Sequence, residues 1–125
     1  MTSPSATQTR YPYQNEPFWS RSERATARRV FDAALKRELH EVMQEAKQKA
    51  SHIKEPADVW ALERYLTRRR KDIDNKYAFR SSRLTRVLGT LLYEGRLTEK
   101  ELLGLREDQI KVIRSCAKVL SEGVA

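Results

Sequence analysis

Apolar residues recur at helical spacing in the segment that begins at Pro56. The members of this stripe are Val59, Leu62, Leu66, Ile73 and Tyr77. Side chains three, four or seven residues apart share one face of an α-helix, so the pattern predicts a helix over residues 56–77. Pro56 suits the first helical position and Asp58 the first turn. One face of this helix is therefore expected to pack against a core.

A longer apolar stripe precedes this segment. Its members are Ala27, Phe31, Leu35, Leu39, Val42, Ala46, Ala50 and Ile53. From Phe31 onward the average step is about 3.7 residues, which is typical of a straight helix and not of a heptad coiled coil. Ser20 and Glu23 have the spacing of a reciprocal capping box, which predicts a helix start there. No proline or glycine interrupts residues 20–52, so the helix is expected to be about 50 Å long.

These two helices predict an antiparallel hairpin over residues 20–80, because only a few residues around Pro56 separate them. The pattern leaves open whether residues 75–82 bend the second helix or continue it. Residues 81–125 predict a small head of short helices, with Gly95 as a left-handed cap and Thr98 and Glu101 as a second capping box. Residues 1–19 are expected to form a disordered tail. The fold class is all-α.

A helix of this length leaves an apolar strip too large for a stable monomer. We therefore expect a homodimer that forms through the long helices around a two-fold axis. The residues assigned to this interface are Phe31, Leu35, Leu39, Val42, Leu62 and Leu66.

The neighbouring face of the second helix has a different character. Trp60 lies about 100° around the helix from Val59, and Arg64 and Lys71 follow it at helical spacing. Arg70 occupies a position where the apolar stripe expects an apolar residue. It can pair with Asp74 one turn on, or it can contact a partner, since an unpaired buried charge is unfavourable. Trp60 can pack on the first helix or serve as an exposed anchor.

The formal net charge is +8, and most of this excess lies between residues 64 and 86. The basic residues of this segment are Arg64, Arg68, Arg69, Arg70, Lys71, Lys76, Arg80, Arg83 and Arg86. Only Asp72 and Asp74 oppose them. A patch of this kind suits an acidic protein surface or a phosphate backbone.

Nothing in the sequence indicates catalysis. It has no glycine-rich phosphate loop, no metal-ligand spacing and no nucleophile elbow, so we expect no enzyme activity, cofactor or metal. His40 and His52 are expected to be solvated, and Cys116 to be a small apolar filler. No apolar run approaches the roughly 18 residues that cross a bilayer, and the N-terminus lacks the pattern of a secretory signal. These features predict a cytoplasmic protein.

Several short motifs stand along the chain, namely Trp19-Ser20, Arg37-Glu38-Leu39, Trp60-x-Leu62, Arg70, Ile73-Asp74-x-Lys76-Tyr77-x-x-Arg80, Leu91-Leu92-x-Glu94-Gly95, Glu101-Leu102 and Leu105-x-x-Asp108. In order and spacing they resemble the motifs of the cyanobacterial fluorescence recovery protein family. The resemblance runs from about Trp19 to the C-terminus, and its most specific part is the Asp-x-Lys-Tyr-x-x-Arg block.

The resemblance implies an all-helical antiparallel dimer that binds the photoactivated orange carotenoid protein and speeds its return to the dark form. It also implies that no cofactor is involved. By position, Trp60 and Arg70 match the family's partner-binding patch, and Val59 matches an aliphatic residue that supports the dimer.

The chain departs from the family pattern beside Trp60 and in the predicted head. Glu63 and Arg64 stand where the family typically has His-Asp, and Arg86 stands where the family can have an aromatic residue. A reversed charge at a charged interface changes which partner fits. Our leading hypothesis is a dimeric, non-enzymatic regulator. The partner-binding residues that we assign to it are Trp60, Glu63, Arg64, Arg70, Lys71 and Arg86. The alternatives are a homologue with a different protein partner and a basic nucleic-acid-associated protein.

Overall fold

The computed structural model describes residues 18–123, and within them the chain is all-helical. The elements are α1 (Arg21–Ser51), α2 (Pro56–Lys76), the 3-10 helix η2 (Ser81–Arg83), α3 (Leu84–Tyr93), the 3-10 helix η3 (Glu99–Leu102) and α4 (Glu107–Ser121). No β-strand occurs among the described residues. The predicted all-α fold class is thus confirmed, while nearly all of the expected disordered tail lies outside residues 18–123.

The chain divides into two compact units. Residues 34–78 form one, which we call the hairpin unit, and residues up to 33 together with those from 79 onward form the other, the terminal unit. The expected boundaries at residues 20–80 and 81–125 differ from this division. The reason is that the first part of α1 contacts residues that follow α2: the ring centroid of Phe31 lies 5.1 Å from that of Phe79, and Glu23 Oε1 accepts a hydrogen bond from Arg106 Nη1 at 3.0 Å.

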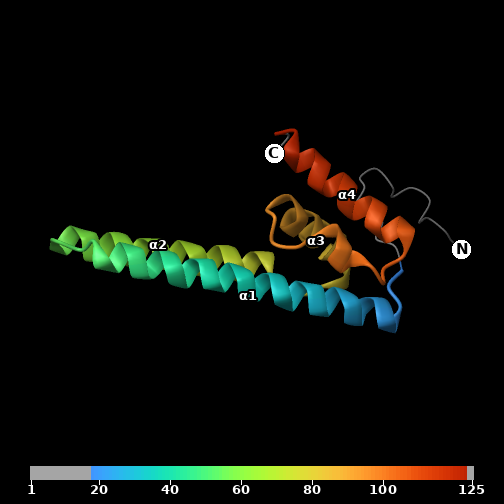
Figure 1. The fold of residues 1–125 in the computed structure, drawn as a ribbon, viewed down its shortest axis with the longest axis horizontal. Helices are drawn as coiled ribbons and strands as arrows, with labels where there is room; N and C mark the ends of the chain where they lie inside the picture. Colours follow the sequence, from blue (N-terminus) through green and yellow to red (C-terminus); the bar gives the residue numbers. More distant parts are fainter. Residues whose placement is uncertain (1–17, 124–125) are drawn as a thin grey trace, which may run out of the picture. The chain divides into compact units, whose positions relative to one another are not determined.

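In the hairpin unit, α1 and α2 lie side by side and run in opposite directions (Figure 1). The turn between them is closed by Asp58, whose Oδ2 accepts hydrogen bonds from the backbone N–H groups of Lys54 at 2.9 Å and Glu55 at 3.2 Å. Pro56 occupies the start of α2, as predicted. The helix ends at Lys76, where the Tyr77 N–H still bonds the Ile73 carbonyl. The second helix therefore does not continue through residues 75–82.

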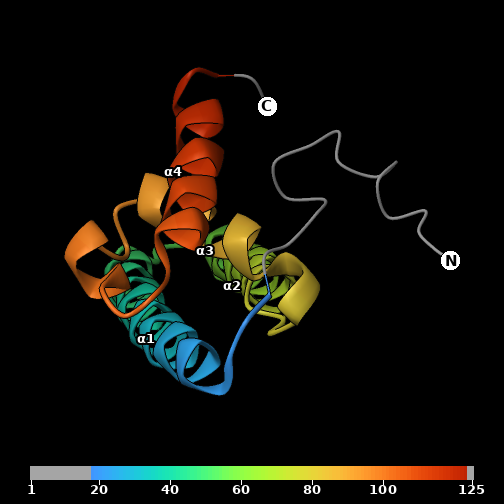
Figure 2. The ribbon, with the colours of Figure 1, turned by 90° about the vertical axis from the view of Figure 1, so that its right-hand side faces the viewer.

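In the terminal unit, α3 and α4 pack against each other (Figure 2). Its completely buried apolar side chains include Leu84, Leu88, Leu91, Leu102 and Ile113. The two helices come close because residue 89 is a glycine: a Cβ there would lie 2.5 Å from the Cβ of Cys116. Gly95 follows α3 with a φ of 77°, which confirms its predicted left-handed conformation.

Both predicted capping boxes are present. The Ser20 N–H donates to Glu23 Oε1 at 2.8 Å, and the Glu23 N–H donates to Ser20 Oγ at 3.2 Å. Thr98 and Glu101 form the second reciprocal pair, although the element that follows is the 3-10 helix η3 and not an α-helix. Capping boxes satisfy N–H groups that a helix start otherwise leaves unbonded, which explains why these sequence signals located both starts.

Candidate functional site

An apolar groove runs along the hairpin unit between α1 and α2, with a volume of about 660 Å³. Its apolar lining comprises Leu35, Leu39, Val42, Leu66 and Ile73, and its polar lining comprises Glu63, Thr67, Arg69, Arg70 and Asp74. Leu39 and Leu66 are 44% and 39% exposed. Four of the residues predicted for the dimer interface, namely Leu35, Leu39, Val42 and Leu66, are thus brought together here.

The other predicted interface residues lie elsewhere. Leu62 is half-buried and does not line the groove. Val59 is exposed and lines a second hollow at the hairpin turn, together with Trp60. Phe31 belongs to the terminal unit, where it is 2% exposed and packs edge-on against Phe79. Its ring is therefore covered within the chain, which removes it from the exposed apolar strip.

Arg70 borders the groove and is exposed. Among residues 18–123 its side chain makes no ion pair or hydrogen bond, with Asp74 or any other group. Asp72, by contrast, lies 3.7 Å from Arg69. An exposed, unpaired guanidinium at the edge of an apolar groove is chemically suited to a carboxylate on another molecule.

The outer face of α2 carries the remaining predicted residues of this helix. Trp60 is 59% exposed, and Arg64 and Lys71 are exposed four and eleven positions further on. Those spacings place all three on one side of the helix. Arg86 is also exposed, but it lies on α3 in the terminal unit.

A buried charge cluster in the hairpin unit escaped the sequence reasoning. The carboxylate of Glu38 is completely buried and accepts hydrogen bonds from Arg69 Nη2 at 2.7 Å, Lys76 Nζ at 3.0 Å and the Tyr77 hydroxyl at 2.9 Å. The sequence does carry a signal for this cluster, because Glu38 lies three residues after Leu35 and four residues before Val42, on the apolar face of the helix. A charge at a core-facing position of a helix indicates a buried partner.

Burial opposes the ionisation of Glu38, but the bonds from Arg69, Lys76 and Tyr77 outweigh it and hold the pKa of this carboxyl below its usual range. Burial likewise opposes the charged form of Arg69, while the contact with Glu38 raises the pKa of this guanidinium. Burial, reinforced by the hydrogen bond to Glu45, raises the pKa of the Tyr65 hydroxyl. The cluster therefore stays ionised at neutral pH and joins α1 to the last turn of α2.

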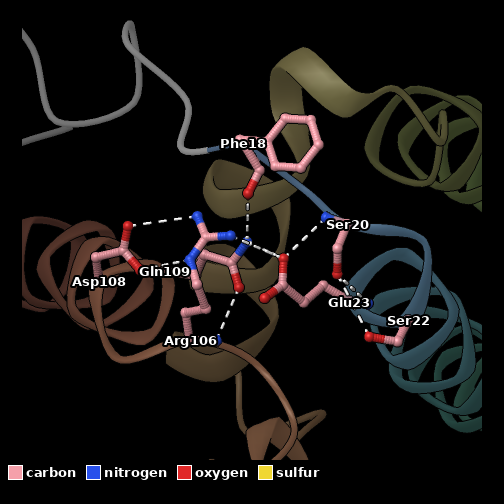
Figure 3. Close-up of polar contacts among 7 residues, drawn as sticks. All are labelled: Phe18, Ser20, Ser22, Glu23, Arg106, Asp108 and Gln109. Atoms are coloured by element: carbon pink, nitrogen blue, oxygen red, sulfur yellow. Dashed lines mark hydrogen bonds and ion pairs between the residues drawn. The ribbon is translucent and has the colours of Figure 1, made fainter.

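A second polar cluster lies in the terminal unit and ties the start of α1 to α4 (Figure 3). Glu23 Oε1 accepts hydrogen bonds from Arg106 Nη1 at 3.0 Å and Gln109 Nε2 at 3.2 Å, while the same Gln109 nitrogen donates to the Phe18 carbonyl at 3.0 Å. The backbone N–H of Ser20, and after it the other donors, hold the pKa of Glu23 below its usual range. These groups satisfy one another, so the cluster is a structural clamp.

Two further properties bear on which functions are possible, namely the grouping of potential metal ligands and the apolar character of the helices. Within residues 18–123, no three His, Cys, Asp or Glu side chains come together as a candidate metal site. In the same part of the chain, no helix combines the length and the apolar character needed to cross a membrane.

Comparisons with known proteins agree with the all-helical fold described above. Residues 19–117 match the model of the family described as photoprotection regulator fluorescence recovery protein. The fluorescence recovery protein of Synechocystis sp. (strain ATCC 27184 / PCC 6803 / Kazusa) is 34% identical over 101 residues, which are 81% of this chain and 93% of that protein. The solved structure of the Fremyella diplosiphon fluorescence recovery protein is 35% identical, with a TM-score of 0.77 over 81% of this chain and 99% of that one. The solved Synechocystis structure gives 34% identity, the same TM-score and the same coverage.

Proposed function

The chain belongs to the fluorescence recovery protein family of photoprotection regulators, and from this premise we propose that it is a non-catalytic, cytoplasmic homodimer that regulates a partner protein by binding it. The observation that carries the proposal is the pairing, on one hairpin, of an exposed apolar groove with an exposed tryptophan on a separate face of α2. The groove would join two copies, and the tryptophan would contact the partner.

A second copy of the chain is the occupant that the groove fits best. The groove gathers Leu39, Leu66 and other apolar side chains at the surface, and two-fold symmetry would set the same groove of each copy against the other. Arg70 and Asp74 both border the groove. In such a pair the arginine of one copy would meet a carboxylate of the other, which would supply the ion pair that Arg70 lacks among residues 18–123.

Trp60 is the proposed anchor for the partner protein. Tryptophan and arginine are enriched among residues that dominate protein interfaces, and Trp60 is 59% exposed with Arg64 on the same side of α2. The orange carotenoid protein, which the family resemblance implies, is the first partner to test. The reversed charge at Arg64 makes a different protein partner the alternative.

The nucleic-acid alternative is weakened by the arrangement of the basic residues. Arg69 and Lys76 are bound to the buried Glu38, so they do not add to an exposed basic surface. A phosphate-binding surface would show an affinity that falls log-linearly and steeply with salt, whereas a surface anchored by Trp60 would keep much of its affinity.

Light scattering after size exclusion tests the dimer. The wild type should have twice the chain mass of 14.6 kDa, and Leu39→Glu should shift it toward a single chain because a charge would enter the groove. Gln44→Glu is the matched control, since Gln44 is exposed on α1 outside the groove. A wild type that stays a monomer at micromolar concentration would refute the dimer.

Isothermal titration with the photoactivated orange carotenoid protein tests the anchor. Trp60→Ala should weaken binding by about 2 kcal/mol or more, roughly 30-fold, while the control Leu103→Ala, which truncates another exposed side chain, should leave affinity unchanged. Equal affinities of wild type and Trp60→Ala would reject this face as the binding surface.

A further inference from the structure

Three exposed cations form a line on the outer face of α2. Arg64, Arg68 and Lys71 are four and three positions apart, so they share one side of the helix over about 10 Å of its length. We call this set the cationic stripe. It lines a shallow hollow of about 320 Å³, whose other lining residues are Glu63, Thr67 and Asp72.

None of the three cations is neutralised within residues 18–123. Arg64 and Lys71 make no ion pair there, and the contact of Arg68 is with the ring of Tyr65, 5.8 Å from its centroid. The two acids that border the hollow contact groups other than these three cations. Glu63 accepts a hydrogen bond from Thr67 at 3.2 Å, and Asp72 faces Arg69 at 3.7 Å.

Like charges at these spacings repel one another on a helix surface. Arg69 and Lys76 of the same helix, by contrast, have the carboxylate of Glu38 as a partner that relieves such repulsion. The cationic stripe has none among the described residues, so an anion supplied from outside would stabilise it. Trp60 precedes Arg64 by four positions on the same side and supplies an apolar contact at one end.

We propose that the cationic stripe binds an acidic helical segment of a partner protein, with carboxylates at helical spacing facing Arg64, Arg68 and Lys71 and an apolar residue on Trp60. The proposal rests on the proposed function and adds the chemistry of the partner to it. A protein segment fits better than a nucleic acid because Glu63 and Asp72 border the hollow. These carboxylates limit the anion-binding track to about 10 Å and would repel a continuous phosphate backbone.

Fluorescence anisotropy with designed peptides tests the proposal on the full chain. The first peptide is an alanine-based helix of about 20 residues, long enough to be helical by itself. It carries three Glu at helical spacing and one Leu a turn away. The second peptide has Gln in place of each Glu, and the third has Lys. The wild type should bind the Glu peptide at least tenfold more tightly than either of the others.

Charge reversal sharpens the test. The double variant Arg64→Glu/Lys71→Glu should bind the Glu peptide with an affinity at least tenfold lower than that of the wild type, and it should bind the Lys peptide instead. Lys36→Glu/Lys47→Glu is the control, because it changes the net charge equally at two exposed positions of α1. It should keep the affinity of the wild type within about twofold, and circular dichroism should show that both variants remain helical.

Three results would overturn the proposal. One is equal binding of the Glu and Gln peptides, and another is an equal loss in the two double variants, which would indicate a general charge effect. The third is tighter binding of a single-stranded DNA of about 20 nucleotides with a steep salt dependence. If the Glu peptide does not bind but the chain dimerises and binds a partner through Trp60, the proposed function stands and the acidic-segment proposal fails. If the Glu peptide binds but the chain never dimerises, the acidic-segment proposal stands and the proposed dimer fails.

Discussion

The two units of this chain are stabilised in different ways. In the terminal unit, apolar side chains of α3, η3 and α4 are completely buried, among them Leu88, Leu102 and Ile113. In residues 34–78, apart from Ala34, the one completely buried side chain is the carboxylate Glu38. The terminal unit therefore resembles the core of an ordinary small domain, while the hairpin unit combines a buried charge cluster with an apolar groove open to solvent.

This difference indicates where binding is expected. The terminal unit also leaves apolar side chains such as Leu103 exposed, but the hairpin unit gathers Leu39 and Leu66 in one groove, where a second molecule would cover both. The Glu38 cluster is suited to holding two helices in one register, because charged groups inside a helix pair accept few alternative alignments. A hairpin with a fixed register keeps its groove and its outer face in constant positions.

The largest expected effect is a cavity in the terminal unit. Leu88→Ala should lower the free energy of unfolding by about 4 kcal/mol, because a completely buried leucine loses its packing. Denaturant unfolding followed by fluorescence in a Trp60→Phe background reports this unit, since the remaining Trp19 is buried. Leu39→Ala, matched in chemistry but 44% exposed, should cost the hairpin unit less than about 1 kcal/mol at concentrations too low for a dimer, measured by denaturant unfolding followed by circular dichroism. Similar losses would contradict the comparison.

The next largest effect concerns the charge cluster. Glu38→Ala should destabilise the hairpin unit by about 3 kcal/mol, because Arg69 and Lys76 would stay largely buried without their carboxylate. Urea unfolding followed by circular dichroism measures it. Glu45→Ala, at an exposed acid that bonds Tyr65, should have a smaller effect. The same loss in both variants would show that the cluster has no special role.

The same cluster predicts a dependence on pH. The pKa of Glu38 is lowered on folding, so its contribution to stability is fully present above the ordinary carboxyl range of about pH 4 to 5 and is lost as the pH falls through the lower, folded pKa. The stability difference between wild type and Glu38→Gln should therefore be largest near pH 7 and shrink below about pH 4. A difference that stays constant down to pH 3 would exclude ionised Glu38 as its source.

The smallest effect is expected at the start of α1. Ser20→Ala removes the hydroxyl that caps the Glu23 N–H, which should cost about 1 kcal/mol. Ser115→Ala, at an exposed position inside α4, is the control and should be neutral or slightly stabilising. Thermal unfolding followed by Trp19 fluorescence in the Trp60→Phe background compares the two, and a neutral Ser20→Ala would show that the Arg106 and Gln109 contacts suffice to hold this end.

Local signals in the sequence were sufficient to locate the helices. Ser20, Pro56, Gly95 and Thr98 each act within a few residues of their own backbone, so their roles follow from spacing alone. The apolar stripe likewise predicted the groove residues Leu35, Leu39 and Val42. The motif block around Lys76 and Tyr77 indicated a family, but not that both side chains bind Glu38.

The sequence by itself determined that the chain is helical, where its helices begin, and which residues lie on a common face, because each of these depends on neighbours one or two turns away. Only the tertiary structure decided that Phe31 is covered by Phe79, that Glu38 is buried among three donors, and that Arg70 stays exposed beside the groove. Such outcomes depend on contacts between residues 31 to 48 positions apart, which no local pattern specifies.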